Sequence, residues 1–369
     1  MKNAMNKKED LMVNIDKTLK SLKEKSFKVF FFVIDTKGTP NGNTQYTYWM
    51  AKRLIDLGYT VEMLYQEEDF VGVSEWLGDE YVDLPHSCIE KTSIKISTAD
   101  FLIIPEVFAN VMNQTKDLPC KRIVLCQNAN FISEFIPIGV SWDNYNIRNV
   151  ITTTDEQKKD IKDLFPNVNV DVIHPEIPSY FRDDGMPKKL MVSVIAKDQS
   201  IVSKIIKQFH WKFPIYRWIT FTDPRGLSKE VFADTLRESA ITVWVDDDTY
   251  FGYAPIEAVK SGSLVIGKIP NVIPEWMYNE EGTVLNNAGL WFSDMRDVQK
   301  LISGAIQWVM NDTIPDVIYT DMEKLKDKYT TEDRVKEIDS VFSRYLTERI
   351  NEIETIKNNV IQKERKENE

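Results

Sequence analysis

Residues 251–267 read FGYAPIEAVKSGSLVIG and decide the fold of this chain. An apolar run, ITVWV at residues 241–245, precedes them, and three acids lie just after that run. The order predicts an apolar strand, a glycine-containing loop, a helix that carries Glu257, and a second apolar strand at residues 264–266. This is the strand–loop–helix–strand unit of an α/β domain, and the start of its helix offers backbone N–H groups to an anion.

An earlier part of the chain shows the same order. Residues 28–34 read KVFFFVI, a continuous apolar run typical of a buried parallel strand. A turn region, DTKGTPNGNTQ, follows, and we then expect a helix at residues 46–57 and a strand at residues 60–65. Together these elements are the first unit of a doubly wound domain.

Further elements extend this order into two halves. In the first half we expect strands at residues 101–104, 123–126 and 150–152, a helix at residues 155–164, and an end at the prolines of residues 170–181. In the second half we expect a strand at residues 190–195, a helix at residues 200–209 and a strand at residues 216–221. The predicted divisions are an N-terminal amphipathic helix, two Rossmann-like domains, and a C-terminal helix with a charged tail, at residues 1–26, 27–182, 183–329 and 330–369.

Both ends of the chain carry helical patterns. Near the N-terminus, apolar residues recur at helical spacing at Leu11, Ile15, Leu19 and Leu22. They favour a helix that packs on the first domain, and a membrane-surface or partner helix is the alternative. Residues 330–346 have an N-cap and an apolar stripe, and from about residue 353 we expect solvated helix or disorder.

Composition narrows the function classes. A chain of 369 residues suggests two domains, and a net charge of −11 disfavours broad nucleic-acid binding. Because no apolar run is long enough for a transmembrane helix and the N-terminal stretch has no apolar core, we expect neither a transmembrane helix nor a secretory signal. The three cysteines lack metal-site spacing and the three histidines are dispersed, so we expect reduced thiols, a cytoplasmic protein and no histidine-based metal site.

Residues 251–267 resemble the retaining GT-B glycosyltransferases (glycosyl transferases group 1, family 4-like), whose signature reads E-G-F-G-x-x-x-x-E-A. Phe251, Gly252, Glu257 and Ala258 fall on matching positions. The resemblance covers about residues 27–345 and implies the GT-B fold. That fold has two Rossmann-like doubly wound domains, the first for the acceptor and the second for the nucleotide-sugar, with a C-terminal helix that crosses back to the first.

The resemblance implies roles on the donor side. Glu257 would bind the ribose hydroxyls of the nucleotide, and the loop at Gly252, Tyr253 and Ala254 would turn backbone N–H groups toward phosphate or sugar. Lys197 would contact the diphosphate. The family's arginine position holds Ala196, so a second cation is sought at Lys204 or Arg225, although Lys204 reads equally well as an exposed helix lysine.

One departure concerns the transferred sugar. The family's first glutamate, which touches that sugar, is replaced by Thr249. Asp248 could substitute, the donor sugar could differ, or the enzyme could be impaired. The acids at residues 246–248 favour a donor loop over a site for a hard cation, so we expect catalysis without a metal or other cofactor.

The acceptor side is expected across the cleft. Gly42, Asn43 and Thr44 follow the first strand, and Gln127 and Asn128 lie just past another buried strand. Polar residues at the carboxyl ends of parallel strands are often functional. We therefore place Gln127 and Asn128 with Thr249 and Asp248 near the reacting groups, and we assign no protein nucleophile.

These features predict a glycosyltransferase that moves a sugar from a UDP- or GDP-linked donor to an acceptor hydroxyl with retention. The expected acceptor is a glycan or polysaccharide, and a modified DNA base is the alternative, as for some viral enzymes of this architecture. A nucleotide-sugar epimerase of the same architecture fits less well, because such enzymes usually line the cleft with carboxylates and histidines and this chain has only three histidines. A pseudoenzyme or binding protein that keeps the fold is the alternative of another class. The oligomeric state is left open.

Overall fold

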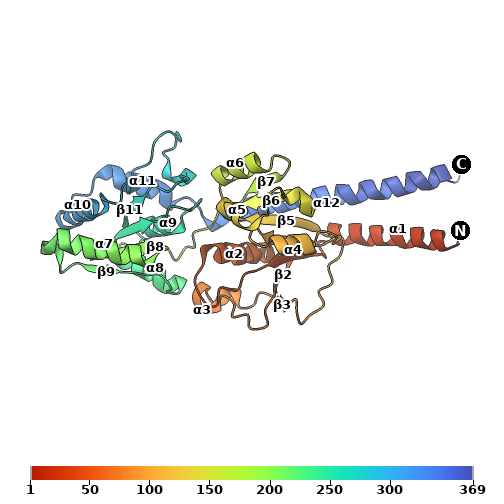
Figure 1. Ribbon diagram of the computed structural model, residues 1–369, viewed down its shortest axis with the longest axis horizontal. Helices are drawn as coiled ribbons and strands as arrows, with labels where there is room; N and C mark the ends of the chain where they lie inside the picture. Colours follow the sequence, from red (N-terminus) through yellow and green to blue (C-terminus); the bar gives the residue numbers. More distant parts are fainter. Residues whose placement is uncertain (1, 368–369) are drawn as a thin grey trace.

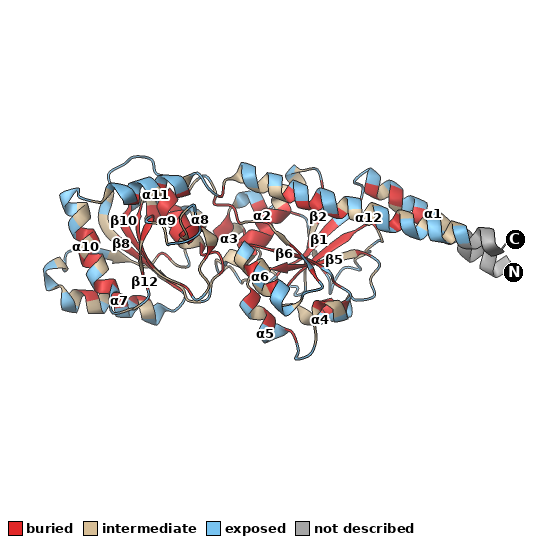
Figure 2. Ribbon diagram, turned by 90° about the horizontal axis from the view of Figure 1, so that it is seen from above, coloured by how far each residue is buried: buried red, intermediate tan, exposed pale blue. Residues whose placement is uncertain are grey.

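The computed structural model describes residues 2–367, with side chains described for residues 10–362. Two parallel β-sheets follow one another along the long axis of the molecule, each between layers of helices (Figure 1). Figure 2 shows that the buried residues gather in the sheets and on the helix faces turned toward them. The prediction of an α/β chain built on parallel sheets is confirmed.

The first sheet has the strand order β3-β2-β1-β4-β5-β6-β7, all parallel. Its strands are β1 (Lys28–Phe32), β2 (Thr60–Tyr65), β3 (His86–Cys88), β4 (Phe101–Pro105), β5 (Lys121–Cys126), β6 (Asn149–Thr152) and β7 (Asn169–Val172). Its helices are α2 (Gly42–Asp56), α3 (Ser74–Leu77), α4 (Ala109–Gln114), α5 (Ile132–Phe135) and α6 (Asp155–Leu164), with 3-10 turns η1 (Asp79–Tyr81), η2 (Ala129–Phe131) and η3 (Trp142–Tyr145).

Strand β1 explains why this sheet is apolar at consecutive positions. Val29 and Phe31 pack in a core with residues of α2, whereas Phe30 and Phe32 pack on the other face with residues of α4 and α6. Helices cover both faces of a doubly wound sheet, so Val29 to Phe32 are all buried, whereas Lys28 at the start of the strand is exposed.

The second sheet has the order β12-β11-β10-β8-β9, again all parallel. Its strands are β8 (Lys189–Ala196), β9 (Thr220–Thr222), β10 (Ser239–Val245), β11 (Leu264–Lys268) and β12 (Gly289–Phe292). Its helices are α7 (Gln199–Lys212), α8 (Lys229–Glu238), α9 (Tyr253–Lys260), α10 (Val298–Asn311) and α11 (Asp316–Lys326), with turns η4 (Pro214–Tyr216) and η5 (Glu275–Met277).

Helix α12 (Thr331–Glu367) returns the chain to the first sheet. Its residues Ile338, Phe342 and Tyr345 are buried in the first-sheet core. Helix α1 (Lys2–Lys23) lies antiparallel beside the last part of α12 (Figure 1), and Lys23 pairs with Glu354 at 2.8 Å. The N-terminal helix thus packs through Ile15, Leu19 and Leu22, while Leu11 is 44% exposed.

Two local expectations were wrong. Helix α2 begins at Gly42 and not at residue 46, because the Asn41 side chain accepts hydrogen bonds from the backbone N–H groups of Asn43 and Thr44 and caps the helix there. Strand β9 covers only Thr220–Thr222, because Pro214 starts a 3-10 turn. The stretch from about residue 353 is helix as far as Glu367, and its described side chains are exposed or partly exposed, as expected for a solvated helix, except that Ile353 is buried.

Two connectors, residues 173–188 and 327–330, join the halves, and they are bonded to each other through Ile177 N–H and the carbonyl of Tyr329 at 3.1 Å. Buried Glu176 of the first connector accepts hydrogen bonds from Arg53 of α2 at 3.1 Å and from Thr331 of α12 at 2.6 Å. The connectors are therefore anchored to the first half.

A histidine ties the connector to both halves. His174 Nε2 lies 3.0 Å from Glu275 of η5, and its Nδ1 lies 3.1 Å from Glu337 of α12. Burial alone would lower the pKa of His174, but the hydrogen bonds to Glu275 and Glu337 outweigh it and raise the pKa to about 9. The imidazolium thus holds carboxylates of both halves at neutral pH.

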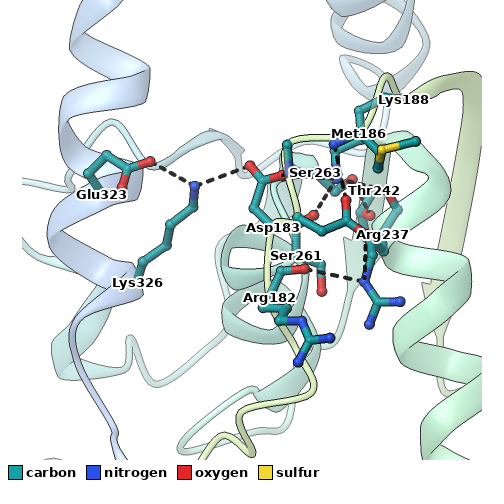
Figure 3. Close-up of polar contacts among 12 residues, drawn as sticks. Arg182, Asp183, Met186, Lys188, Arg237, Thr242, Ser261, Ser263, Glu323 and Lys326 are labelled. Atoms are coloured by element: carbon teal, nitrogen blue, oxygen red, sulfur yellow. Dashed lines mark hydrogen bonds and ion pairs between the residues drawn. The ribbon is translucent and has the colours of Figure 1, made fainter.

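Figure 3 shows how the same connector meets the second half. Lys326 at the end of α11 reaches Asp183 at 3.3 Å and Glu323 at 2.7 Å. Lys188 donates to the carbonyl of Arg237 at 2.7 Å and to that of Ser261. These contacts fix the connector's far end on the second half.

Candidate functional site

A cavity of about 390 Å³ opens between the two sheets, at the carboxyl ends of their strands. In each sheet the strand order reverses here, between β1 and β4 in the first and between β8 and β10 in the second. Connections leave such neighbouring strands in opposite directions and open a crevice. Residues 40–43 after β1, Lys197 after β8 and Asp246 after β10 all line the cavity.

The helix α9 begins at the cavity. Its N-cap is Gly252, with φ of 69°, and a Cβ atom there would lie 3.0 Å from the ring of Trp244, so both conformation and space require glycine. The hydroxyl of Thr249 accepts a hydrogen bond from the Gly252 backbone N–H at 3.0 Å. No described side chain caps the helix at Gly252, so the amides of Tyr253 and Ala254 can meet an anion.

A buried ion pair lies one turn further along this wall. Glu257 of α9 is 1% exposed, and its Oε1 lies 3.0 Å from Nζ of Lys229, the first residue of α8. Both residues line the cavity. Among the described residues, Oε2 of Glu257 receives no hydrogen bond, so this oxygen is available to a ligand hydroxyl.

Lys197 places a positive charge at the mouth of the cavity. Its Nζ lies 2.9 Å from Oδ1 of Asp246 and donates to the backbone carbonyl of Asp248 at 2.9 Å, and its side chain is 66% exposed. The Asp248 backbone N–H donates to Asp246 at 3.1 Å. The acidic loop after β10 is thus folded on itself, and Lys197, which helps to hold it, remains accessible to a ligand.

Arg225 lies beside Ala196, the position at which the resembling family has an arginine. Its Nη1 donates to the carbonyls of Ala196 at 2.9 Å and Lys197 at 3.1 Å. A fork of two hydrogen bonds, at 2.8 and 2.5 Å, fixes the guanidinium on Asp223. A cation therefore lies next to Ala196, although it comes from the loop after β9.

The opposite wall is built around a buried carboxyl group. Glu106 follows β4, is 1% exposed, and its Oε1 accepts the backbone N–H groups of Gln127 at 3.1 Å and Asn128 at 2.8 Å. Burial raises the pKa of Glu106 to about 7, although these amide hydrogen bonds lower it. The Gln127 amide donates to the carbonyl of Asn43 at 2.9 Å and to the hydroxyl of Thr47 at 2.7 Å.

The two walls touch across the cavity. Asn128 Nδ2 donates to the backbone carbonyl of Asp248 at 3.3 Å. A Cβ atom at Gly42 would lie 3.3 Å from the ring of Tyr253, so glycine lets the start of α2 approach the start of α9. Two helix N-termini therefore converge on one space.

Most of the residues predicted for the site line this cavity: Gly42, Asn43, Gln127, Asn128, Lys197, Asp248, Thr249, Gly252, Tyr253, Ala254, Glu257 and Arg225. Thr44 does not, because it is buried in the first turn of α2. Lys204 does not either. It is exposed on α7, whose buried face carries Val202, Ile205 and Phe209, so helix phase turns Lys204 to solvent.

Two residues of the site were missed in the sequence. Lys229 opens a helix, where a cation opposes the helix dipole, and that unfavourable position was a usable signal. Glu106 ends a strand as a lone carboxylate, and nothing local indicates that it meets the loop after β5.

The acids after β10 do not form a metal centre among the described residues. Asp246 pairs with Lys197 and Asp247 pairs with Lys268. No group of three or more histidine, cysteine, aspartate or glutamate side chains within the described part of the chain is arranged to hold a metal ion.

No known protein-family profile matches the chain. An α-1,6-glucosyltransferase of Actinobacillus pleuropneumoniae serotype 7 (strain AP76) is 22% identical over 198 residues, which cover 53% of this chain. The match spans 60% of the length of that relative.

Solved structures share the whole fold. Sucrose-phosphate synthase of Thermosynechococcus elongatus has a TM-score of 0.60 at 9% identity, covering 87% of this chain and 99% of that one. HepE of Anabaena in complex with UDP-glucose has a TM-score of 0.60 at 11% identity, covering 86% and 99%.

An α-glucosyltransferase in complex with UDP and a 13-mer DNA that contains an HMU base has a TM-score of 0.55 at 12% identity, covering 88% and 99%. At these identities the likeness establishes the fold. The predicted GT-B fold is confirmed.

Proposed function

We propose that this protein is a glycosyltransferase that binds a nucleoside diphosphate sugar on the second domain and transfers the sugar to an acceptor hydroxyl. The observation that carries the proposal is Glu257, buried on α9 with one carboxylate oxygen free, beside the uncapped start of the same helix. Such a carboxylate suits a pair of ribose hydroxyls, and the helix start suits a diphosphate. The fold shared with HepE, whose structure contains UDP-glucose, supports the same assignment.

The leaving nucleoside diphosphate gains negative charge as the glycosidic bond breaks. Lys197 and Arg225, together with the amides of Tyr253 and Ala254, would stabilise that charge without a metal ion. Lys229 would hold the carboxylate of Glu257 in place. In our proposal the chemistry retains the anomeric configuration and needs no cofactor.

The acceptor would enter against the first domain, where Asn43, Gln127 and Asn128 line the cavity. We propose a glycan acceptor, because the curated relative is named an α-1,6-glucosyltransferase and the chain carries a net charge of −11, which disfavours nucleic acid. We place the reaction in the cytoplasm, since all three cysteines are free thiols.

Nucleotide binding tests the proposal most directly. Isothermal titration with UDP, GDP and ADP should give saturable one-site binding for at least one of them, and Glu257→Gln should weaken that binding. Lys204→Gln is the matched control, because it removes a charge from the same domain outside the cavity. Absence of binding for all three nucleotides would overturn the proposal.

Turnover separates an enzyme from a protein that only keeps the fold. Thr249 stands where the resembling enzymes carry a glutamate, and its hydroxyl is used to hold Gly252. We expect hydrolysis of at least one donor from a panel of UDP- and GDP-sugars, with a changed preference in Thr249→Glu. If both proteins bind nucleotide and neither turns over any donor, the chain is a binding protein.

A further inference from the structure

Two exposed tryptophans stand out on the second domain. The chain has nine tryptophans. Trp211 at the end of α7 is 76% exposed and Trp218 is 58% exposed, and Ile215 between them is 75% exposed. The other seven tryptophans are buried or partly buried. We call Trp211, Ile215 and Trp218 the tryptophan patch.

The core does not require these three side chains. The buried face of α7 carries Val202, Ile205 and Phe209, and the partly buried Phe213 and Tyr216 of the same segment pack against that core. The patch residues alternate with them and point outward. Large apolar side chains left in water at one place mark a surface that binds something.

The charge around the patch is positive, in contrast to the whole chain. Residues 199–222 contain no aspartate or glutamate and include the exposed Lys204, Lys207, Lys212 and Arg217. None of these four forms a salt bridge with a described carboxylate, and the neighbouring helix α10 also has no acidic residue. A chain with a net charge of −11 thus keeps one basic, aromatic surface.

We propose that the tryptophan patch and its cations attach the protein to an anionic lipid bilayer. Tryptophan favours the interface between water and hydrocarbon, isoleucine gains from burial among acyl chains, and lysine and arginine beside them meet anionic headgroups. A protein partner fits less well, because interface cores are depleted of lysine. Nucleic acid fits less well too, because Ile215 has no ring on which a base could stack.

The attachment leaves the cavity open. Helix α7 starts next to Lys197 at the cavity and runs 14 residues to the patch, so the two are separated by about 21 Å. Helices α7 and α10 lie at the end of the molecule opposite to α1 (Figures 1 and 2). The bilayer would therefore bind the end of the second domain that carries α7 and α10. The cavity would stay accessible to acceptors at a distance from the membrane surface.

Cosedimentation of the full chain with vesicles tests the inference. We expect binding to vesicles of phosphatidylcholine with about 30 mol% phosphatidylglycerol, and weak binding to vesicles of phosphatidylcholine alone. Binding to the anionic vesicles should weaken as the salt concentration rises, because salt screens the attraction. Trp211→Ser with Trp218→Ser should lower the partition coefficient at least about tenfold, and Lys212→Glu with Arg217→Glu should do the same.

The control is Val317→Ser with Tyr319→Ser, which removes two exposed apolar side chains from α11 and should leave vesicle binding unchanged. Thermal unfolding should be the same for all variants, since every changed side chain is exposed. Trp211→Phe with Trp218→Phe should keep most of the binding but lose the blue shift of tryptophan emission on vesicles that the parent and the control show.

Three results would overturn the inference. The first is vesicle binding that survives both patch variants and is lost in Lys17→Glu with Lys20→Glu, since α1 would then be the attachment. The second is a lipid-free dimer in sedimentation velocity that the patch variants abolish. The third is binding of a single-stranded oligonucleotide that the patch variants abolish while vesicles do not bind.

Discussion

The two walls of the cavity differ in chemistry, because one presents charged side chains and the other presents hydrogen-bonded amides. The second-domain wall exposes charge, with Lys197 66% exposed and the ion pair of Lys229 and Glu257 facing the space. The first-domain wall presents amides and one hydrogen-bonded network built on buried Glu106. A charged donor needs counter-charges that it can reach, whereas a neutral acceptor needs dipoles held in fixed directions.

The largest effect is expected at the exposed charge. Lys197→Ala should lower kcat by about 100- to 1000-fold with saturating donor, because the lysine acts on the leaving group. The free energy of unfolding should change by less than about 1 kcal/mol, because an exposed ion pair contributes little. Single-turnover kinetics and urea unfolding measure the two quantities. A kcat equal to that of the parent would show that Lys197 does not act on the leaving group.

The buried carboxyl group of the opposite wall should act through stability and pH. The pKa of Glu106 is raised from 4.5 to about 7 in the folded protein, so its contribution to stability is fully present below pH 4.5 and is lost as the pH rises through 7. That loss is about 3 kcal/mol.

The test is Glu106→Gln, which cannot ionise. Between pH 4.5 and pH 8, the unfolding free energy of the parent should fall by about 3 kcal/mol relative to that of Glu106→Gln. Urea titrations at several pH values measure it. A difference that is constant over this range would mean that Glu106 does not titrate there.

Glu257 should matter for the donor and not for the acceptor. Glu257→Ala should weaken nucleoside diphosphate binding by about 1.5–3 kcal/mol, the scale of lost hydrogen bonds to a charged group. The KM for acceptor should stay the same if the walls divide the work as described. Calorimetry and initial rates check both, and a large change in acceptor KM alone would reverse the assignment of the walls.

The smallest effect is expected where the walls meet. Asn128→Ala removes the hydrogen bond from Nδ2 to the carbonyl of Asp248, which is long at 3.3 Å. Nucleotide affinity should fall by about 0.5–1 kcal/mol, because one neutral hydrogen bond contributes that much. Gln127→Ala is the comparison, since its amide bonds only within the first domain and should leave nucleotide affinity unchanged.

The sequence predicted the second wall better than the first. Gly252, Tyr253, Ala254 and Glu257 lie in one local segment, so spacing alone brings them to one place. Lys229 was missed and Lys204 was chosen because the two cations differ in helix phase and tertiary position, which a linear motif does not encode. The fold itself was predictable, since the apolar strands and their glycine-containing turns recur in both halves.

The first wall depends on contacts between strands that are far apart in sequence. The sequence indicated that Gln127 follows a strand. It did not indicate that the Gln127 amide already donates hydrogen bonds to Asn43 and Thr47 of α2. Glu106 acts only because β4 and β5 are neighbours, so that their following loops meet. Such a network appears only once strand order and register are known.

The return of α12 to the first sheet has a consequence for synthesis on the ribosome. The last strand of that sheet ends at Val172, but Phe342 and Tyr345, which cover one of its faces, are made roughly 170 residues later. At typical elongation rates that interval is on the order of 10 to 30 s. During it the second domain can fold, while the part of the first-sheet core that α12 covers stays exposed. We expect that surface to be prone to aggregation until α12 is made.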